Sequence, residues 1–390
     1  MKIVLATEVF PPKAGGAGWS TRALALALKE AGHDVRVITT AEGSPDEGGV
    51  RVIRVRGVAG RFRRGPMTDI FRAAIEREVA GVDVVHAQHA LSALGALALD
   101  PRPRTLVTVR DHWPVCFWST RISQGALCPR CSAGGMWRCI EGRLPKLSAP
   151  LSIPYMTHDL SLKRSALTRA EGVIAVSDAI ASELREAGIP RVQVIPNIVD
   201  AREVNDIATP PPSISLPDRF LLFVGKLEAN KGALDLVPAV VRAKTGLPLV
   251  VLGSGAERDA ILADAQRQGI EVLLPGWAER HDVLRAMKRA EALVFPSTWP
   301  EPLSRVLLEA MALGTPIAAM NTGGTSELIE HEASGLLART VDDLAAALAR
   351  IVHDAGVRSG LAAGAIERSA LFSPSALIPR YEAAYRGVAS

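Results

Sequence analysis

The chain has 390 residues, 48% of them hydrophobic, and its formal net charge is +4. It is too long for one ordinary core, so two globular domains are expected. No uncharged run approaches the roughly 18 residues of a membrane span. No basic and then apolar leader precedes the first strand, so we expect a cytoplasmic protein or one at the cytoplasmic face of a membrane.

The charge is unevenly divided along the chain. Residues 1–198 contain 26 Lys and Arg against 18 Asp and Glu, and the remainder contains 19 against 23. A basic N-terminal half fits an anionic partner such as a phosphate-bearing lipid, a membrane surface or nucleic acid. It equally fits a merely soluble surface, because Arg51, Arg54 and Arg56 alternate as on the wet face of a strand.

The start of the chain reads as one α/β unit. A strand at Lys2–Thr7, a loop at Glu8–Gly18, a helix at Ser20–Ala31 and a strand at Asp34–Thr39 are predicted. Alternation of this kind implies a doubly wound parallel sheet. Further strands are predicted at Val50–Val55, Val82–His86, Thr105–Val109, Gly172–Val176 and Val192–Ile195.

A segment rich in Pro and Ser, Asp206–Asp218, interrupts this series. A second series of strands then follows at Phe220–Val224, Leu249–Leu252, Glu271–Leu274, Ala292–Phe295 and Pro316–Met320. The predicted fold class is α/β, with two Rossmann-like, doubly wound parallel-sheet domains facing across a cleft, and ligands beyond the carboxyl ends of the strands. We expect the domains at residues 1–200 and 201–372, with a closing helix in 373–390.

The segment 295–330, FPSTWPEPLSRVLLEAMALGTPIAAMNTGGTSELIE, carries two glutamates in a fixed relation. Glu301 lies between two prolines, and Glu309 lies on a helix predicted from Leu303 to a C-cap at Gly314. Eight helical residues rise roughly 12 Å, about the reach from a hexose to the ribose of a nucleotide sugar. Glu301 can therefore hold sugar hydroxyls and Glu309 ribose hydroxyls. Alternatively, Glu309 only pairs with Arg305 on a solvated helix face.

Gly323 and Gly324 follow the next apolar strand and open onto a helix, which is how a backbone anion site is built. Together with the two glutamates, this arrangement closely resembles the C-terminal signature of retaining, nucleotide-sugar-dependent glycosyltransferases with the GT-B fold, in particular glycosyltransferase family four. The resemblance extends over most of the chain.

The resemblance implies that a sugar moves from a nucleoside diphosphate sugar to an acceptor hydroxyl with retention of anomeric configuration. It implies a front-face mechanism with no protein nucleophile and no cofactor required for catalysis. The implied acceptor is a saccharide or a lipid-linked molecule in cell-envelope polysaccharide or glycolipid synthesis, with peripheral membrane contact and no nucleic acid. The closing helix is expected to pack back on the N-terminal domain.

Several residues acquire roles through the same resemblance. Lys226 and Lys231 look like the basic pair that neutralises the donor diphosphate, although either lysine alone is commonly a solvated surface residue. Gly15 and Gly16 resemble the N-terminal glycine loop that faces the phosphate and the reacting sugar. Further implied contacts to the substrate come from Gly225, Trp277, Ala278, Leu303, Ser304 and Arg305.

The family usually presents a histidine after its fourth N-terminal strand, and this chain departs from that pattern. In the segment VTVRDHW, residues 107–113, the aligned position is Arg110. Arg110 can contact a phosphate or a sugar oxygen, and Asp111 can orient an acceptor hydroxyl. His112, two residues on, serves either in catalysis or as a packing or capping histidine.

All four cysteines, Cys116, Cys128, Cys131 and Cys139, lie within 24 residues. The Cys-x-x-Cys spacing of the middle pair predicts a structural zinc site completed by the outer two. Free or conditionally paired thiols are the alternative, and disulfides suit a reducing compartment poorly. The same insertion, residues 111–150, holds aromatic and basic residues that fit either a membrane interface or lipid-linked acceptor, or a self-packed insertion.

Two other function classes remain open from the residues. A nucleotide-sugar epimerase would use the same architecture and would convert donor without an acceptor. A nucleic-acid-binding protein would read its target with a zinc-containing cysteine loop. Against the second, the basic residues are thinly spread and no known reader motif surrounds the cysteines.

Overall fold

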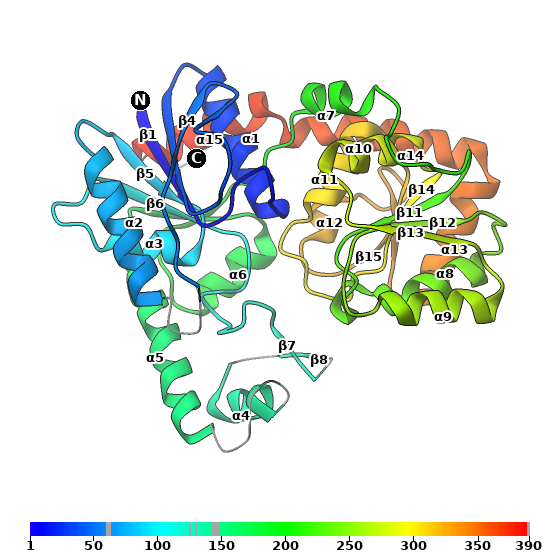
Figure 1. The fold of residues 1–390 in the computed structure, drawn as a ribbon, viewed down its shortest axis with the longest axis horizontal. Helices are drawn as coiled ribbons and strands as arrows, with labels where there is room; N and C mark the ends of the chain where they lie inside the picture. Colours follow the sequence, from blue (N-terminus) through cyan, green and yellow to red (C-terminus); the bar gives the residue numbers. More distant parts are fainter. Residues whose placement is uncertain (60–63, 125, 129–130, 142, 144–148, 388–390) are drawn as a thin grey trace. The chain divides into compact units, whose positions relative to one another are not determined.

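The computed structural model describes residues 1–390 except 60–63, 125, 129–130, 142, 144–148 and 388–390 (Figure 1). The chain forms two compact units. Unit 1 consists of Met1–Ile198 with Pro374–Ser390, and unit 2 is Val199–Ser373.

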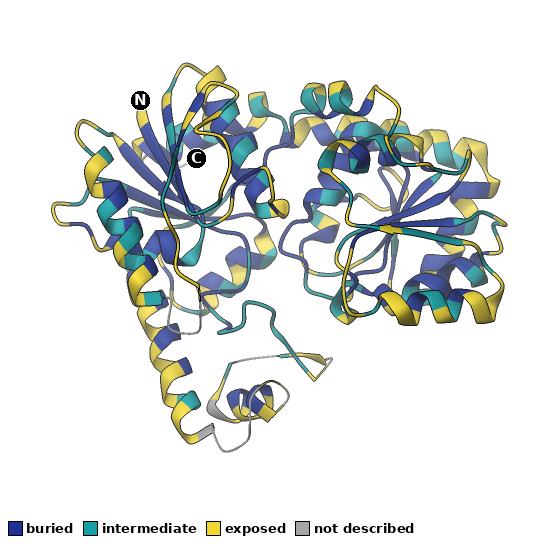
Figure 2. Cartoon of the chain, viewed as in Figure 1, coloured by how far each residue is buried: buried dark blue, intermediate teal, exposed yellow. Residues whose placement is uncertain are grey.

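Unit 1 is built on a sheet with the strand order β10-β9-β6-β5-β1-β2-β4-β3, parallel except for the β3–β4 pair. Its inner strands are almost wholly buried, as Figure 2 shows, because helices cover both faces of a parallel sheet. The strands are β1 (Lys2–Thr7), β2 (Asp34–Thr39), β3 (Asp46–Glu47), β4 (Val50–Arg54), β5 (Val84–Ala87), β6 (Arg104–Val109), β9 (Gly172–Ala175) and β10 (Val192–Val194).

The helices of unit 1 outside the insertion are α1 (Gly16–Glu30), α2 (Arg64–Glu78), α3 (Ala90–Leu97), α5 (Ala149–Thr168), α6 (Asp178–Glu186) and α15 (Pro374–Arg386). Helix α1 begins four residues before the predicted start at Ser20. Its first turn is rich in glycine, which disfavours a helix, but packing decides otherwise. A Cβ on Gly18 would lie 2.6 Å from the Cβ of Ala14, so this turn must carry glycine.

Helix α15 follows unit 2 in the sequence and packs within unit 1, beside α1 (Figure 1). Its Tyr381 and Tyr385 are 1% and 2% exposed. The hydroxyl of Tyr385 lies 2.8 Å from Nδ1 of the buried His86 on β5. Arg380 donates to the carbonyl of Val194 on β10 at 2.6 Å. The helix therefore completes the core of unit 1.

The insertion contains little regular structure in its described part. Two short strands, β7 (Ile122–Ser123) and β8 (Ala126–Leu127), form a hairpin, and helix α4 (Ala133–Glu141) follows. Met136 and Ile140 of α4 pack with Met156 and Leu160 of α5 in a small separate core. Much of α5 is exposed (Figure 2). Within the described residues no helix is both long and apolar enough to cross a bilayer.

Unit 2 has a six-stranded, wholly parallel sheet in the order β13-β12-β11-β14-β15-β16. The strands are β11 (Leu221–Val224), β12 (Leu249–Leu252), β13 (Val272–Gly276), β14 (Ala292–Phe295), β15 (Ile317–Met320) and β16 (Leu336–Ala338). The α-helices are α7 (Ala201–Ala208), α8 (Leu236–Ala243), α9 (Arg258–Gln268), α10 (Arg280–Arg289), α11 (Arg305–Leu313), α12 (Thr325–Leu328), α13 (Val341–His353) and α14 (Ala355–Ser369). Short 3₁₀ turns lie at Ala229–Lys231, Ala233–Asp235 and Ala370–Phe372.

Both sheets reverse their winding direction once near the middle. In unit 2 the chain runs outward from β11 to β13 and then returns to place β14 on the other side of β11. In unit 1 the corresponding reversal lies between β1 and β5. The predicted fold class, two doubly wound parallel α/β units, is confirmed. Ligand sites in such sheets lie beyond the carboxyl ends of the strands at these reversals.

Candidate active site

Three loops of unit 2 meet at the carboxyl edge of its sheet through backbone contacts. Gly225, directly after β11, has a φ of +157°. A Cβ on Gly253, after β12, would lie 1.8 Å from the carbonyl oxygen of Gly225. The N–H of Gly253 donates to the carbonyl of Gly276, at the end of β13, at 2.9 Å. Glycine is required here because the backbones touch.

A partly buried lysine and a buried glutamate form a pair in the adjoining loops. Nζ of Lys231 donates to Oε1 of Glu301 at 2.7 Å, and Oγ of Ser297 donates to the same oxygen at 2.6 Å. Nζ also lies 4.0 Å from the centroid of the Trp299 ring, which favours a cation there. Glu301 is 4% exposed. The structure thus brings together two predicted site residues that are 70 positions apart, and adds Ser297 and Trp299.

The glycine loop after β15 rests on the backbone of Glu301. Gly323 has a φ of +54°, and a Cβ there would lie 2.3 Å from the carbonyl oxygen of Glu301. The N–H of Gly324 donates to that oxygen at 2.7 Å. The helix that this loop opens onto, α12, has four residues, so it contributes little of the dipole that the predicted anion site would use.

Glu309 lies on a buried face of α11, not on the solvated face of the alternative reading. It is 5% exposed, and its Oε1 accepts from Nε of Arg305 at 3.0 Å and from Nη2 and Nε of Arg280 at 3.1 and 3.2 Å. Arg280 also lies 3.6 Å from Glu203. In the described part of the chain no donor reaches Oε2 of Glu309 or Oε2 of Glu301, so each carboxylate keeps one oxygen for another donor.

The ends of α11 follow from capping. The helix begins at Arg305, two residues after the predicted Leu303, because Oγ of Ser304 caps it by accepting from the N–H of Leu307. Leu303 and Ser304 are both buried. Gly314 closes the helix in the left-handed conformation with a φ of +68°, as predicted.

The remaining predicted residues of unit 2 are open to solvent. The side chain of Lys226 is 73% exposed, and its Nζ lies 3.6 Å from Glu228. Trp277 is 66% exposed and Ala278 partly exposed. These side chains have room for a ligand. The Lys226–Glu228 pair is thus exposed, whereas the Lys231–Glu301 pair is partly buried.

Gly15 and Gly16 lie at the start of α1, after β1 at the reversal of unit 1. Gly15 is the N-cap, and the helix begins at Gly16. A Cβ on Gly15 would meet nothing within 4 Å, so open space adjoins this turn. The first turn of a 15-residue helix presents backbone N–H groups that suit an anion.

Arg110 and His112, which follow β6, are held by different partners in the protein. Arg110 is 9% exposed, and its guanidinium donates to Oδ1 of Asn197 at 3.0 Å and to the side chain of Gln88. His112 is 2% exposed, with Nδ1 2.7 Å from Glu183. Both side chains are thus held by the protein, and for His112 the structure favours the packing role over catalysis.

Two histidines near Arg110, the fully buried His86 and the partly buried His89, were not predicted as site residues. Burial, followed by the nearby charge of Arg110, lowers the pKa of His89 to about 3. The same causes hold the pKa of His86 well below its usual value. Both imidazoles are therefore neutral near pH 7. His89 directly precedes α3 at the end of β5, where Nδ1 lies 3.0 Å from Oγ1 of Thr7.

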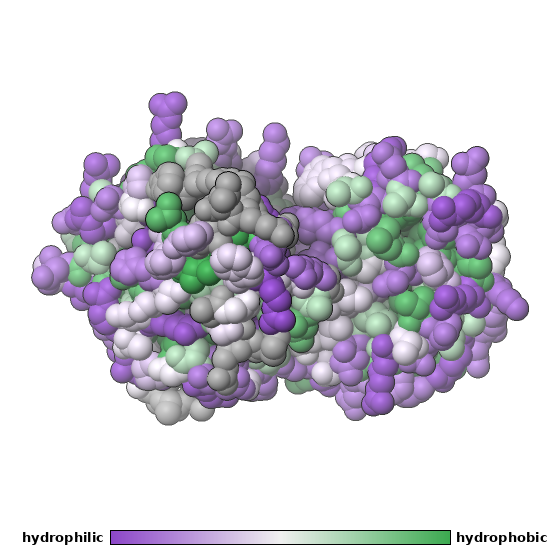
Figure 3. Space-filling model, turned by 90° about the horizontal axis from the view of Figure 1, so that it is seen from below, coloured by the Kyte–Doolittle hydropathy of each residue, from purple (hydrophilic) through white to green (hydrophobic). Residues whose placement is uncertain are grey.

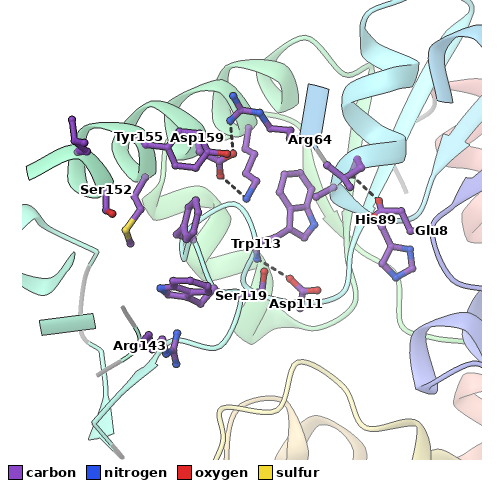
Figure 4. Close-up of a pocket in the computed structure, with 17 residues that line it drawn as sticks. Glu8, Arg64, His89, Asp111, Trp113, Ser119, Arg143, Ser152, Tyr155 and Asp159 are labelled. Atoms are coloured by element: carbon purple, nitrogen blue, oxygen red, sulfur yellow. Dashed lines mark hydrogen bonds and ion pairs between the residues drawn. The ribbon is translucent and has the colours of Figure 1, made fainter. Parts of the chain in front are cut away.

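A cavity of about 950 Å³ opens in unit 1 beside these residues (Figure 4). Glu8 and His89 line it from the reversal between β1 and β5, and Asp111 from the end of β6. Oδ1 of Asp111 accepts from the N–H of Trp113 at 2.8 Å. Burial raises the pKa of Asp111 by more than this hydrogen bond lowers it. The position matches the edge where ligands gather in doubly wound sheets.

A charged network crosses the cavity wall formed by α2 and α5. Asp159, 3% exposed, pairs with Arg64 and, at 2.7 Å, with Lys163 (Figure 4). The guanidinium of Arg64 lies 5.6 Å from the Tyr155 ring, and Nζ of Lys163 lies 5.6 Å from the Phe117 ring. Cations packed over aromatic faces give this wall both apolar and positively charged character.

The insertion also lines the cavity, with Trp113, Phe117 and Trp118, and Phe117 packs against Tyr155 of α5. The indole N–H groups of Trp113 and Trp118 are buried, and neither has an acceptor among the described residues. Buried donors are normally satisfied, so these two call for an oxygen-bearing ligand or water. Apolar patches between hydrophilic side chains mark the face of unit 1 seen in Figure 3. Exposed apolar side chains in this part of the sequence include Leu127 and Trp137 of the insertion and Leu151 near the start of α5.

The four cysteines are free thiols that line a second cavity, of about 370 Å³. Burial, followed by the charge of Cys116, raises the pKa of Cys131 to about 11. Burial also raises the pKa of Cys128. In the described part of the chain, no three His, Cys, Asp or Glu side chains are already arranged to hold a metal ion.

Two family models match almost end to end along the chain. "Glycosyltransferase Family 4" matches residues 14–203, and "Glycosyl transferases group 1" matches residues 207–368. The chain belongs to glycosyltransferase family four. It is an α/β glycosyltransferase of the GT-B fold, as the sequence signature predicted.

Relatives of this family-four glycosyltransferase support the assignment. A glycogen synthase of Mycobacterium tuberculosis is 27% identical, over 94% of this chain and 90% of the relative. A D-inositol 3-phosphate glycosyltransferase of Xylanimonas cellulosilytica is also 27% identical, over 92% and 88%. The structure of Anabaena HepE with UDP-glucose has the same fold, with a TM-score of 0.74, 20% identity and full coverage of both chains.

Proposed function

We propose that this glycosyltransferase binds a nucleoside diphosphate sugar on unit 2 and transfers the sugar, with retention, to an acceptor hydroxyl bound in the cavity of unit 1. The Lys231–Glu301 pair is the observation that carries this proposal. It places a cation and a carboxylate together among loops that only glycine allows to meet, at the reversal of the sheet. The UDP-glucose complex of HepE and the names of the two relatives support a nucleotide-sugar donor and a hydroxyl acceptor.

Each donor group has a distinct task in this proposal. The bond between the anomeric carbon and the diphosphate oxygen breaks while the acceptor oxygen bonds to the same face of that carbon. The acceptor proton passes to a donor phosphate oxygen. Lys226 and Lys231 stabilise the negative charge on the departing diphosphate, without a catalytic metal. Oε2 of Glu301 accepts from sugar hydroxyls, and Oε2 of Glu309 accepts from the ribose.

The cavity of unit 1 suits a saccharide or a lipid-linked saccharide as acceptor. Sugar rings stack on aromatic side chains such as Phe117 and Tyr155, while the indole N–H groups of Trp113 and Trp118, which find no acceptor among the described residues, donate to ring substituents. Asp111 orients the reacting hydroxyl. Arg64 and Lys163 would attract a phosphate-linked acceptor, which fits a role in envelope polysaccharide or glycolipid synthesis.

A panel of UDP-, GDP- and ADP-sugars tests the proposal through thermal stabilisation and the release of nucleoside diphosphate. We expect one donor class to raise Tm and to release product slowly in water and faster with a saccharide acceptor. Lys226→Ala should lower kcat/KM by about tenfold or more without changing Tm, because Lys226 is exposed and fixed cations act on the transition state. Lys288→Ala, an equal loss of charge on the exposed side of α10, is the matched control.

Two results would contradict the proposal. Donor conversion that needs no acceptor and yields no free diphosphate would indicate an epimerase. Equal activity of the Lys226→Ala and Lys288→Ala variants would remove Lys226 from the donor site.

A further inference from the structure

The fold collects all four cysteines of the chain around one cavity of unit 1. Cys116 comes from the segment before the β7–β8 hairpin, Cys128 and Cys131 follow the hairpin, and Cys139 lies on α4. All four side chains line the same cavity. This cluster has no task in donor binding or in the chemistry of transfer.

One of the sulfur atoms accepts a hydrogen bond from the backbone. The N–H of Arg121 donates to Sγ of Cys116 at 3.4 Å. This donor partly offsets the cost of forming a buried thiolate, and the thiolate is the form that binds metal ions.

The insertion lacks the apolar core that would otherwise hold it. Its separate core is fully buried at four described residues, two of them on α4 and two on α5. The two strands of its hairpin have two residues each. Substructures of this size generally need a disulfide or a metal ion to hold one conformation.

We propose that Cys116, Cys128, Cys131 and Cys139 bind one structural Zn²⁺ that fixes the insertion to unit 1. The Cys-x-x-Cys spacing with two outer cysteines is that of tetrahedral zinc sites. Zn–S bonds of about 2.3 Å in a tetrahedron would place the sulfurs about 3.8 Å apart. Zn²⁺ replaces four thiol protons, so no oxidant or reductant is needed.

Binding requires a local closure of the cluster, since no three of the thiols are already set around a common centre. The cavity of about 370 Å³ leaves room for the side chains to turn inward around the ion. Disulfides would instead need an oxidant that neither the structure nor sugar transfer supplies.

The site would also position one wall of the acceptor cavity, and this part rests on the proposed function. Phe117 and Trp118 directly follow Cys116 and line that cavity. Arg121, whose N–H holds the sulfur of Cys116, and His112 both bind Glu183 on α6. Zinc would therefore act on acceptor binding in unit 1 and leave nucleotide binding to unit 2 unchanged.

The metal content of the full chain decides the proposal without any activity measurement. Protein purified with a thiol reductant, without chelator, from zinc-supplemented cells should contain one zinc per chain by plasma mass spectrometry. Exchange with Co²⁺ should give the d–d absorption of a tetrahedral thiolate site. A chain without zinc whose four thiols all react with an alkylating agent, or one that contains disulfides, would overturn the proposal.

Variants assign the ligands. Cys128→Ser with Cys131→Ser should lower the zinc content by about tenfold or more. Ser182→Ala, a one-atom change on the exposed side of α6, should keep it. Zinc retained by the double variant would refute this site. Should the double variant fail to fold, the single Cys116→Ser variant and the Co²⁺ spectrum of the unchanged chain decide.

A separate measurement tests whether zinc positions the wall of the acceptor cavity. Removal of zinc by a chelator should raise KM for the acceptor about tenfold while leaving the Tm shift caused by the nucleotide unchanged. Unchanged acceptor kinetics in the zinc-free protein would refute the positioning role. A protein that binds zinc but responds to no donor would count against the proposed function and not against the zinc site.

Discussion

Glu309 combines a proposed ligand contact with a structural pair. Its buried Oε1 neutralises Arg280 and Arg305, so removal of the carboxylate by Ala would leave two buried cations without it and cost roughly 3–5 kcal/mol. A loss of activity in Glu309→Ala would therefore not distinguish unfolding from lost ribose binding.

Glu309→Gln separates the two effects, because it keeps the shape and one oxygen acceptor. We expect donor KM to rise about tenfold with kcat little changed, since the ribose is held equally in the ground and transition states. Initial rates across donor concentrations, with urea unfolding as the stability control, measure this. A normal donor KM in a folded variant would remove the ribose role.

Asp111, the acidic residue after β6, lines the cavity of unit 1 and is proposed to orient the acceptor hydroxyl. Its pKa is raised on folding, so this group lowers stability as pH rises above the unfolded pKa of about 3.9. Asp111→Asn should then leave Tm at pH 7 unchanged or higher while acceptor-dependent turnover falls about tenfold or more. Full turnover, or a loss of turnover explained by a lower Tm, would argue against the orienting role.

Among single residues, the sequence predicted those whose role follows from the local conformation of the backbone. Gly314 had to close a helix, and Glu301 stood between prolines next to a glycine loop. It did not predict Arg280, Ser297 or His89, because each acts through a partner far away in sequence or through burial. Nothing in the pattern RDHW shows that His112 would turn to Glu183 on α6.

At the scale of elements, most buried strands were predicted, because each is a short, almost wholly apolar run between turns, but β16 was missed. The start of α1 was missed because its glycines oppose a helix until packing around Gly18 is known. The hairpin and α4 of the insertion were not predicted, since strands of two residues leave no period to read.

Two histidines, one on β5 and one directly before α3, make the stability of unit 1 sensitive to acid. His86 is fully buried and His89 partly buried, and the pKa values of both are lower in the folded than in the unfolded chain, so both are neutral near pH 7. The contribution of these histidines to the free energy of unfolding is fully present above the unfolded pKa of about 6.5. It is lost as the pH falls from there toward 3.

Replacing His89 tests this acid dependence. In His89→Asn, where Asn is a good N-cap for α3, the fall in unfolding free energy between pH 6 and pH 4 should be smaller by about 1.4 kcal/mol per pH unit. Urea titrations at several pH values measure it, with the exposed His353→Asn as control. Parallel pH curves for His89→Asn and the unchanged protein would contradict it.

At the scale of the whole molecule, unit 1 is assembled from both ends of the chain. Length predicted two domains, but the packing of the last helix within the first unit was expected only from the family resemblance. The amphipathic pattern of α15 does not indicate which of the two sheets this helix packs against. Its two tyrosines meet β5 through His86, about 300 positions earlier.

Deleting residues 374–390 should therefore unfold unit 1 and spare unit 2. Loss of two buried tyrosines, at roughly 3–5 kcal/mol each, is comparable with the whole stability of a domain. Limited proteolysis should degrade residues 1–198 and leave 199–373 protected and still stabilised by the nucleotide. Equal protection of both segments would show that α15 is dispensable.

The two-ended construction of unit 1 also sets an order of events on the ribosome. Residues 199–373 are contiguous and can fold as soon as they leave the exit tunnel, whereas the first 198 residues must wait for residues 374–386 to be translated. A nascent chain that stalls early would carry a finished second unit and an open first unit, which chaperones and proteases can recognise. Completion of the first unit thus reports that translation has passed the last helix.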